Sequence, residues 1–340
     1  MKTSVLIIYT GGTIGMKTDT KTGALVPFDF SGIYDEFPSL KRLNVDIEVM
    51  TLPPIDSSNV SPADWTTMAR IIRDNYDRHD GFVVLHGTDT MSYSASALSF
   101  MLRNLAKPVV FTGSQIPIGV LRTDGRENLI TAIEIAGARR PDGRPEIAEV
   151  ALYFQNRLFR ANRTTKISAE ALNAFRSYNY PPLAEVGVSI AYDRNAVMPP
   201  AAEPLEVFTD FNPNVMVLKL FPGIGERALR GMLSLEGIEG IVLETFGAGN
   251  APTAAWFVDA VGQAVADGKI VLNVTQCLDG EVSMGLYETG LALQRAGVLC
   301  GRDITTEAAV AKMMYVLGAE GSHEGRTALL NRPICGEFTE

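Results

Sequence analysis

The chain has 340 residues, 46% of them hydrophobic, and a formal net charge of −9 at pH 7. This length allows two domains or one large domain, with enough buried apolar surface to need no disulfide or metal staple. The acidic balance argues against a nucleic-acid backbone or an anionic membrane as partner. It does not exclude an anionic small substrate, because one nearby Lys or Arg can outweigh the overall negative charge.

The cysteines and histidines are few and scattered along the chain. They are Cys277, Cys300, Cys335, His79, His86 and His323. The sequence has no CxxC pair, so neither a zinc ribbon nor a redox dithiol is indicated, and the histidines are too dispersed for a His-rich metal site. Sparse, odd-numbered cysteines are typical of a reducing compartment.

The N-terminal apolar run, residues 5–9, is shorter than a signal-peptide core, and Gly-Gly follows it without a cleavage-site pattern. No stretch of the sequence approaches the ~20 apolar residues of a membrane span. We therefore expect a cytoplasmic protein that has neither a membrane nor a nucleic acid as partner.

Short apolar runs rich in β-branched residues alternate with helical patterns along the chain. The expected strands are 5–9, 46–50, 81–86, 108–112, 150–154, 215–220, 240–244 and 269–275. Several of these runs are apolar at successive positions, which is typical of strands covered on both faces of a sheet.

Three helices are expected between the first strands. One begins after Ser61, with Pro62 at its first position and Asp64 placed to complete a capping box. A second spans about 91–105, and a third follows Asn128. This alternation of strands and helices predicts a mostly parallel α/β sheet with right-handed crossovers.

Residues 191–212 contain several prolines and show no clean periodicity, so we interpret them as a linker. The strand–helix alternation resumes after them on a smaller scale. The expected architecture is a two-domain α/β protein. Its larger N-terminal domain, residues 1–190, holds the mostly parallel sheet, and its smaller C-terminal α/β domain covers 213–340.

Ligands of open α/β sheets bind beyond the carboxyl ends of the strands. Four successive strand ends are followed here by Gly, Ser, Thr and Asp: TGGTIG at 10–15, DSSN at 56–59, GTDT at 87–90 and GSQ at 113–115. Turns and caps use the same residue types, so a purely structural interpretation remains open. A hydroxyl-rich rim on all four ends favours a functional site.

The first of these loops carries Thr13 behind Gly11 and Gly12, which permit a tight turn and a close backbone approach. Its spacing fits neither G-x-G-x-x-G nor G-K-[ST], so a nucleotide-phosphate cradle is not indicated. Residues 16–23 are polar and turn-rich. We expect them to form a lid at the mouth of the site, with 26–30 as its far hinge.

A threonine hydroxyl is a weak nucleophile unless a base activates it. The sequence has no G-x-S-x-G motif, and His86 lies inside an expected strand, so we interpret it as a packed imidazole. Lys166, which follows the fifth strand, is the best-placed base, with Asp89 to hold its ammonium. The alternative is that Lys166 is an ordinary surface lysine.

Seven motifs occur in order over essentially the whole chain. They are TGGTIG (10–15), DSSN (56–59), HGTDTM (86–91), TGSQIP (112–117), NRTTK (162–166), GNAP (249–252) and NVTQC (273–277). Together they resemble the L-asparaginases of the bacterial cytoplasmic type. Separated motifs that match at strand ends are far more specific than any one of them alone.

The resemblance implies hydrolysis of L-asparagine to L-aspartate and ammonia through a threonine acyl-enzyme, without metal or cofactor. It implies that Thr13 is the nucleophile that attacks the side-chain amide carbon. Thr88 is then the second essential threonine and Lys166 its base. Asp89 orients the lysine and also binds the substrate α-amino group.

The resemblance also implies how the substrate and the subunits are held. Asp56, Ser57 and Ser58 would bind the α-carboxylate and α-ammonium of asparagine, and we place Ser114 with these substrate-binding residues. Family members assemble as dimers or dimers of dimers. Asn250 would therefore reach a site of the facing subunit from the smaller domain.

Two places depart from the family pattern, and one cysteine of the pattern is kept. The loop stretch 22–27 lacks the usual tyrosine, so Tyr34 or another residue would take its role, or the loop works differently. Glu244 stands where some members have a regulatory arginine, so that form of allostery is not expected. Cys277 is present and is interpreted as a small buried apolar residue.

Two other functions remain open. One is a different substrate on the same machinery, either glutamine or the substrate of the amide-hydrolysing subunit of a tRNA-dependent amidotransferase. That subunit usually carries an extra N-terminal domain, whereas this sequence starts at the first strand. The other is a non-enzymatic amino-acid-binding protein, against which the paired threonines and the lysine argue.

Overall fold

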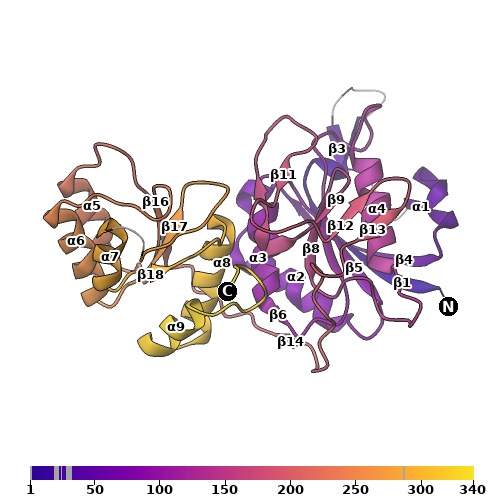
Figure 1. The fold of residues 1–340 in the computed structure, drawn as a ribbon. Helices are drawn as coiled ribbons and strands as arrows, with labels where there is room; N and C mark the ends of the chain where they lie inside the picture. Colours follow the sequence, from indigo (N-terminus) through magenta and orange to yellow (C-terminus); the bar gives the residue numbers. More distant parts are fainter. Residues whose placement is uncertain (1, 19–22, 24, 28–32, 286–287) are drawn as a thin grey trace. The chain divides into compact units, whose positions relative to one another are not determined.

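The computed structural model describes residues 2–18, 23, 25–27, 33–285 and 288–340. The chain divides into two compact units, Met1–Thr209 and Asp210–Glu340, each with its own sheet (Figure 1). The division falls inside the segment 191–212. Both units are α/β, which confirms the expected fold class, while the finer boundaries at 190 and 213 stay predictions.

The first unit contains an eight-stranded sheet with the strand order β13-β12-β9-β8-β7-β5-β1-β4. Its parallel strands are β1 (Thr3–Gly11), β4 (Val45–Ile55), β5 (Gly81–Leu85), β7 (Val109–Thr112) and β8 (Val150–Phe154). All five were predicted from apolar runs. Because they are parallel, their carboxyl ends meet at one edge of the sheet, where the candidate residues follow.

An antiparallel extension was not predicted. It consists of β9 (Arg157–Arg160), β12 (Ala184–Val186) and β13 (Ile190–Tyr192). The hairpin from β8 to β9 turns at Gln155 and Asn156, whose φ angles are 45° and 69°. β9 begins and ends with arginine, so its sequence lacks the apolar run by which the other strands were recognised.

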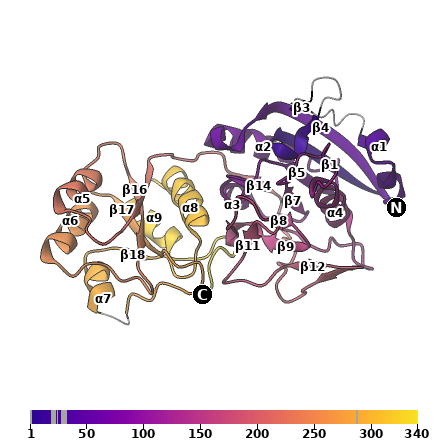
Figure 2. The same cartoon turned by 90° about the horizontal axis from the view of Figure 1, so that it is seen from above.

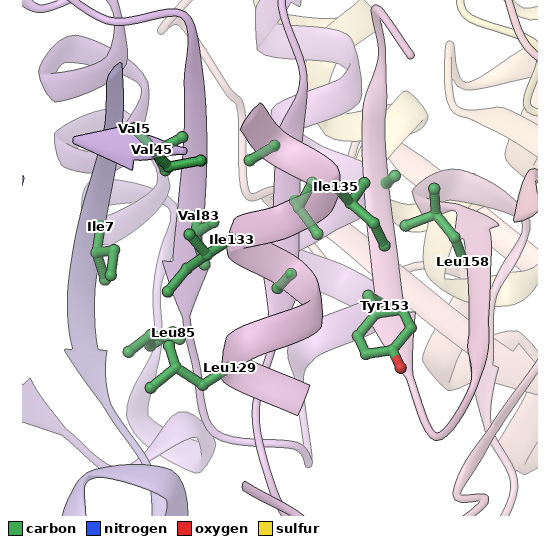
Figure 3. Packing of buried hydrophobic residues seen from close by; sticks show 14 of the residues in the cluster. Val5, Ile7, Val45, Val83, Leu85, Leu129, Ile133, Ile135, Tyr153 and Leu158 are labelled. Atoms are coloured by element: carbon green, nitrogen blue, oxygen red, sulfur yellow. The ribbon is translucent and has the colours of Figure 1, made fainter. Parts of the chain in front are cut away.

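Helices cover the sheet of the first unit. They are α1 (Ile33–Glu36), α2 (Pro62–Asp74), α3 (Met91–Met101) and α4 (Gly125–Gly137). Figure 3 shows Leu129 and Ile133 of α4 against Val83 and Leu85 of β5. Side chains of a strand alternate between the two faces of the sheet. Phe82 and Val84 of β5, which are fully buried, therefore lie on the face opposite to α4.

The predicted start of α2 is confirmed in detail. The Ser61 backbone N–H donates to Asp64 Oδ2 at 2.8 Å, and the Ser61 hydroxyl donates to the same oxygen at 2.7 Å. Pro62 occupies the first helical position. Together these contacts fix where α2 begins beside the end of β4.

Two helix boundaries differ from the expectation. α4 begins at Gly125, so Asn128 lies within its first turns instead of preceding it. α3 ends at Met101, because Leu102–Arg103 form β6 and pair with β14 (Glu206–Val207). That pairing partner lies 103 positions later in the sequence, where a helical periodicity pattern cannot reveal it.

Two short ladders lie near the strand ends. β2 (Met16–Thr18) pairs with β3 (Leu25–Pro27), and β10 (Thr165–Lys166) pairs with β11 (Phe175–Arg176). The expected loop at 16–23 therefore begins with a strand. The rest of the expected lid and most of its hinge fall on 19–22, 24 and 28–32, outside the described residues.

The second unit has a four-stranded parallel sheet with the order β15-β16-β17-β18. Its strands are β15 (Val215–Lys219), β16 (Gly240–Thr245), β17 (Ile270–Thr275) and β18 (Leu299–Cys300). The first three confirm the predicted strands. Its helices are α5 (Glu226–Leu233), α6 (Ala255–Ala266), α7 (Glu288–Arg295), α8 (Thr306–Ala319) and α9 (His323–Leu330).

Within this unit, α5 and α6 lie on one side of the sheet and α8 on the other (Figure 2). Leu218, Leu243 and Val271 of the sheet belong to the buried cluster with Phe257 of α6. Over the described ranges of both units, every helix is too short or too polar to cross a bilayer.

A buried ion pair ties the C-terminal segment to α8. Lys312 Nζ lies 2.7 Å from Glu337 Oε1, and both side chains are fully buried. Lys312 also donates to the carbonyl oxygens of Leu330 and Arg332 at 2.9 Å and 2.7 Å. Burial lowers the pKa of Lys312, against the opposing effect of Glu337. The carboxylate is thus the counter-charge of a lysine at a costly, water-excluded location.

Replacing Glu337 with alanine is expected to lower the free energy of unfolding by about 3–5 kcal/mol, because it leaves a buried ammonium without its counter-charge. Urea denaturation of the full chain measures the loss. The control is Glu226→Ala, which removes an exposed pair with Arg230 and should cost less than about 1 kcal/mol. Equal losses in the two variants would contradict this role for the pair.

Candidate active site

Glycines bring the strand-end loops of the first unit into close contact. A Cβ on Gly11 would lie 2.3 Å from the Ile55 carbonyl oxygen, and one on Gly12 would lie 2.4 Å from Gly87 Cα. A Cβ on Gly87 would lie 2.6 Å from Ser57 Oγ. Gly11 and Gly12 also have φ angles of 124° and 83°, which favour glycine. The loops after β1, β4 and β5 therefore meet only because these positions lack side chains.

Thr13 opens a 3-10 turn, Thr13–Gly15, directly after this contact, and it is half-buried. Since Gly12 touches Gly87, Thr13 and Thr88 each lie one residue from the same backbone contact. The first loop and the β5 loop thus present their threonines at neighbouring points of the sheet edge.

The structure brings Thr88, Asp89 and Lys166 together. Lys166 Nζ lies 2.9 Å from Thr88 Oγ1 and 2.6 Å from Asp89 Oδ1. The side chain of Lys166 is 16% exposed, whereas that of Asp89 is 68% exposed. The ammonium is therefore largely withdrawn from water, between a buried hydroxyl and a carboxylate that remains accessible. An ordinary surface lysine would not be held in this way.

Gln115 completes this cluster and was not singled out from the sequence. The Thr88 hydroxyl donates to Gln115 Oε1 at 3.1 Å, and Gln115 Nε2 donates to the Ala171 carbonyl oxygen at 3.2 Å. The second bond sets the orientation of the amide. Thr88 therefore directs its proton to Gln115 and accepts a hydrogen bond from Lys166.

The backbone of the loop that carries Gln115 is hydrogen-bonded to Asp124, the residue before α4. Its two carboxylate oxygens accept from the backbone N–H groups of Gln115 and Ile116, each at 3.0 Å. The motif TGSQIP contains Gln115, but its partners Ala171 and Asp124 lie elsewhere in the sequence. Only the folded structure shows which residue of the motif reaches Thr88.

Ser114, expected among the substrate-binding residues, is buried. Its hydroxyl donates to the Ile116 carbonyl oxygen at 2.7 Å. A Cβ on the preceding Gly113 would lie 2.4 Å from the His86 carbonyl oxygen, so this fourth loop also packs on the β5 loop. The Ser114 side chain serves the turn itself, and its role toward a substrate stays a prediction.

The loop after β4 presents a charged carboxylate. Asp56 Oδ1 accepts from the Ser58 backbone N–H at 2.9 Å and from the Ser58 hydroxyl at 2.7 Å. The first of these bonds is the main cause that lowers the pKa of Asp56 below its usual value. Ser57 is buried, and its carbonyl oxygen accepts from the Thr90 hydroxyl at 2.7 Å. The loops after β4 and β5 are thereby joined.

Tyr34 lies far from these loops. Its hydroxyl accepts from the Ile47 backbone N–H at 3.2 Å, and Ile47 pairs with Val5 near the start of β1. Ile55, which precedes Asp56, is eight residues further along β4, or about 26 Å at ~3.3 Å per residue. Tyr34 is therefore not the residue that replaces the missing loop tyrosine, and positions 22 and 24 of that loop lie outside the described residues.

The second unit carries three further residues of the sequence analysis. Asn250 is half-buried in the turn after β16, where its backbone N–H donates to the Phe246 carbonyl oxygen at 2.7 Å. Glu244 accepts from the Thr306 hydroxyl at 2.6 Å. Cys277 is exposed, so its interpretation as a buried residue was wrong. It follows β17, where the strand has already left the core.

Across the residues that the structure describes, no group of three or more His, Cys, Asp or Glu side chains is arranged to hold a metal ion. The strand ends present the hydroxyls of Thr13 and Thr88, the largely buried ammonium of Lys166, and the exposed carboxylates of Asp56 and Asp89. Carboxylates suit the binding of an amino acid. Hydroxyls beside an ammonium suit proton transfer to or from an acyl centre.

Comparisons with known proteins agree along the whole chain. The family model "Asparaginase, N-terminal" matches residues 4–198, and "Glutaminase/Asparaginase C-terminal domain" matches 214–330. L-asparaginase 1 of Escherichia coli K12 is 41% identical, over 99% of this chain and 98% of its own length. The structure of L-asparaginase I from Vibrio cholerae superposes with a TM-score of 0.91 at 41% identity, covering 100% of both chains.

Relatives with other names are also similar to the chain. The 60 kDa lysophospholipase of Mus musculus is 40% identical over 98% of this chain, which spans 62% of that protein. A subunit of the Pyrococcus abyssi glutamyl-tRNA(Gln) amidotransferase is more distant, at 32% identity over 98% of this chain and 76% of its own length.

The contact between the β4 and β5 loops makes a prediction for stability. Replacing Gly87 with alanine is expected to lower the free energy of unfolding by about 1–3 kcal/mol, because the new methyl group overlaps Ser57. Chemical denaturation measures the change. The matched control is Gly187→Ala, since a Cβ there meets no atom within 4 Å. It should leave stability unchanged or raise it by up to about 1 kcal/mol. A Gly87→Ala protein as stable as this control would disprove the tight contact.

Proposed function

The chain belongs to the asparaginase family, and from this premise we propose that it is an L-asparaginase that hydrolyses L-asparagine to L-aspartate and ammonia. The family membership confirms the resemblance drawn from its motifs. The observation that carries the proposed chemistry is the position of Lys166, whose Nζ contacts both Thr88 and Asp89. Thr88 follows Gly87, and Thr13 follows Gly12, the glycine that packs against Gly87.

In the proposed first step, Thr13 Oγ1 attacks the side-chain amide carbon of asparagine. The C–O bond forms, the hydroxyl proton passes to the leaving nitrogen, and the C–N bond breaks to release ammonia. Water then attacks the resulting ester in the same way and returns the Thr13 hydroxyl and aspartate. The glycine-rich turns offer backbone N–H donors for the oxyanion in both steps.

Thr88 and Lys166 are the proposed proton carriers, with Asp89 controlling their charge. Asp89 Oδ1 lies 2.6 Å from Lys166 Nζ. When the α-ammonium of the substrate binds Asp89, the carboxylate is shared between two cations. Substrate binding and the lysine that transfers the proton then meet at one carboxylate.

The ends of the substrate explain the remaining polar residues. Asp56 is charged at neutral pH and exposed, so it suits the α-ammonium of asparagine, and Ser57 and Ser58 suit the α-carboxylate. Ser114 and Asn250 are proposed as further substrate contacts. Asn250 would act from the facing subunit in a homodimer or a dimer of dimers. The protein would work in the cytoplasm, in asparagine catabolism, without metal or cofactor.

Glutamine hydrolysis and a role within an amidotransferase are the alternatives. The lower identity to the Pyrococcus abyssi amidotransferase chain favours asparaginase over the second. Ammonia release from free asparagine and free glutamine by the purified chain separates all three. Asparagine turnover without any partner supports the proposal, and a higher kcat/KM for glutamine would replace it. Tight asparagine binding without turnover would indicate a binding protein.

Replacing Thr13 with alanine should reduce ammonia release from asparagine by about 10⁴-fold or more, because the nucleophilic oxygen is lost. Lys166→Met should lower kcat by about 10²–10⁴-fold with a smaller change in KM. A coupled ammonia assay measures both. Circular dichroism checks folding, and Lys2→Met, at an exposed lysine near the amino end of β1, is the control. Full activity of the Thr13→Ala protein would end its assignment as nucleophile.

Gln115 is proposed to position the Thr88 hydroxyl and the segment after Lys166. Gln115→Met keeps the length of the side chain but removes both hydrogen bonds. We expect kcat to fall about tenfold with little change in KM, as for one lost hydrogen bond of about 1.4 kcal/mol in the transition state.

The pH profile distinguishes this role from a purely structural one. Gln115→Glu restores an acceptor for Thr88 and adds a negative charge beside the Lys166 ammonium. A nearby carboxylate raises the pKa of a lysine, so the pH at which kcat rises should move upward in this variant, with kcat partly recovered at high pH. An unmoved pH profile in Gln115→Glu would show that Gln115 does not act on the lysine.

A further inference from the structure

The turn that carries Thr13 is held at both of its ends. One end is Gly12, which packs against Gly87. The other end is Gly15, whose backbone N–H donates to the Gly12 carbonyl oxygen at 3.1 Å. Thr13 lies between them, and its carbonyl oxygen accepts from the Met16 backbone N–H. The position of Thr13 therefore depends on what fixes Gly15 as much as on what fixes Gly12.

Gly15 packs against the end of the Tyr9 side chain. A Cβ on Gly15 would lie 1.9 Å from the Tyr9 hydroxyl oxygen and 2.2 Å from Tyr9 Cζ. The φ angle of Gly15 is not positive, unlike those of Gly11 and Gly12, so its backbone conformation alone does not call for glycine. Glycine is required at this position because the end of the tyrosine ring occupies the space in which a side chain would begin.

A hydrogen bond joins the same two residues. The Tyr9 hydroxyl donates to the Gly15 carbonyl oxygen at 3.4 Å. Tyr9 is 1% exposed, and burial raises its pKa, so the hydroxyl keeps its proton and stays a donor at physiological pH. The bond is long, and the packing of the ring end against Gly15 is the stronger of the two constraints. Both act on the backbone that closes the turn.

Tyr9 itself is fixed by the sheet. It lies near the end of β1, where it pairs with Thr51 of β4 on one side and with Leu85 of β5 on the other. Its side chain belongs to the buried hydrophobic cluster of the first unit, and the fully buried Ile14 of the turn belongs to the same cluster. The turn is therefore anchored to a strand that has a hydrogen-bonded neighbour on each side.

We propose that Tyr9 is the positioning residue of the nucleophile: its ring end and hydroxyl fix Gly15, and the turn that Gly15 closes fixes the Thr13 oxygen. This inference rests on the proposed function, in which Thr13 attacks the amide carbon. Attack requires the oxygen within about 3–3.5 Å of that carbon, and an error of about 1 Å can cost about 10²-fold in rate. Tyr9 acts on the rate through the backbone and does not touch the substrate.

Tyr9→Phe removes only the hydroxyl, and Tyr153→Phe is its matched control. Tyr153 is also 1% exposed and in the same cluster, but it lies on β8 and hydrogen-bonds to Thr131 (Figure 3). In Tyr9→Phe we expect kcat for asparagine to fall about tenfold, as for one lost hydrogen bond. KM should change less than about twofold, because the hydroxyl does not reach the substrate. Tyr153→Phe should keep kcat within about twofold of the unmodified protein.

Hydrogen–deuterium exchange tests the turn without any substrate. The N–H groups of Gly15 and Met16 close the turn, so their exchange reports how often it opens. Mass spectrometry that resolves single amides should find both exchanging about tenfold faster in Tyr9→Phe than in Tyr153→Phe. A loss of overall stability alone would raise exchange along β1 as well, and would leave kcat of the folded protein unchanged.

Gly15→Ala tests the same contact from the side of the turn. The added methyl group overlaps the end of the Tyr9 ring, so the turn must shift, and kcat should fall by about 10²-fold with little change in KM. The control is Gly187→Ala, since a Cβ there meets no atom within 4 Å. Circular dichroism checks that each variant is folded under assay conditions. Should Tyr9→Phe fail to fold, Gly15→Ala decides, and the reverse holds as well.

Three results would overturn the proposal. They are an unchanged kcat in Tyr9→Phe, a loss confined to KM, and exchange at Gly15 and Met16 no faster than in the control. Failure of the proposed function gives another pattern, in which the unmodified protein releases no ammonia from asparagine or Thr13→Ala keeps full activity. Faster exchange at the turn would then still support the hold of Tyr9 on Gly15, without a nucleophile to position.

Discussion

The close backbone contact between the β1 and β5 loops is the constraint on which the site depends. Parallel strands bring their carboxyl ends to one edge, but the side chains that follow would normally keep the loops apart. Gly12 and Gly87 remove that barrier, and Gly11 does the same toward Ile55. Thr13 and Thr88 directly follow the two glycines in the sequence, so each begins one residue from this backbone contact.

The second requirement of the site is electrostatic. Lys166 comes from β10, outside the parallel strands, and its ammonium is held by one buried hydroxyl and one exposed carboxylate. Asp89 is the accessible partner of the pair, so a cation that arrives from the solvent can reach its carboxylate. In the proposed mechanism, this arrangement couples substrate binding to proton transfer through one carboxylate.

Much of the fold could be predicted from the sequence, because buried parallel strands are continuous apolar runs and α2 carries a complete capping box. The strand-end loops could be found for the same reason, since they follow those runs. β9 could not, because it begins and ends with arginine. Arg160 is buried there with an ion pair to Glu149 at 2.6 Å and a hydrogen bond to the Ala196 carbonyl oxygen at 2.9 Å. Gln115 was missed because its partners, Thr88 and Ala171, are brought to it by folding.

The hydrogen bond of His86 serves the same constraint as the glycines. Nδ1 lies 2.7 Å from the Gly87 carbonyl oxygen, so the ring donates to the glycine whose Cβ would overlap Ser57. The imidazole is fully buried and cannot be displaced by solvent. A side chain that sequence reasoning assigns to packing therefore also fixes the backbone of the turn that leads to Thr88.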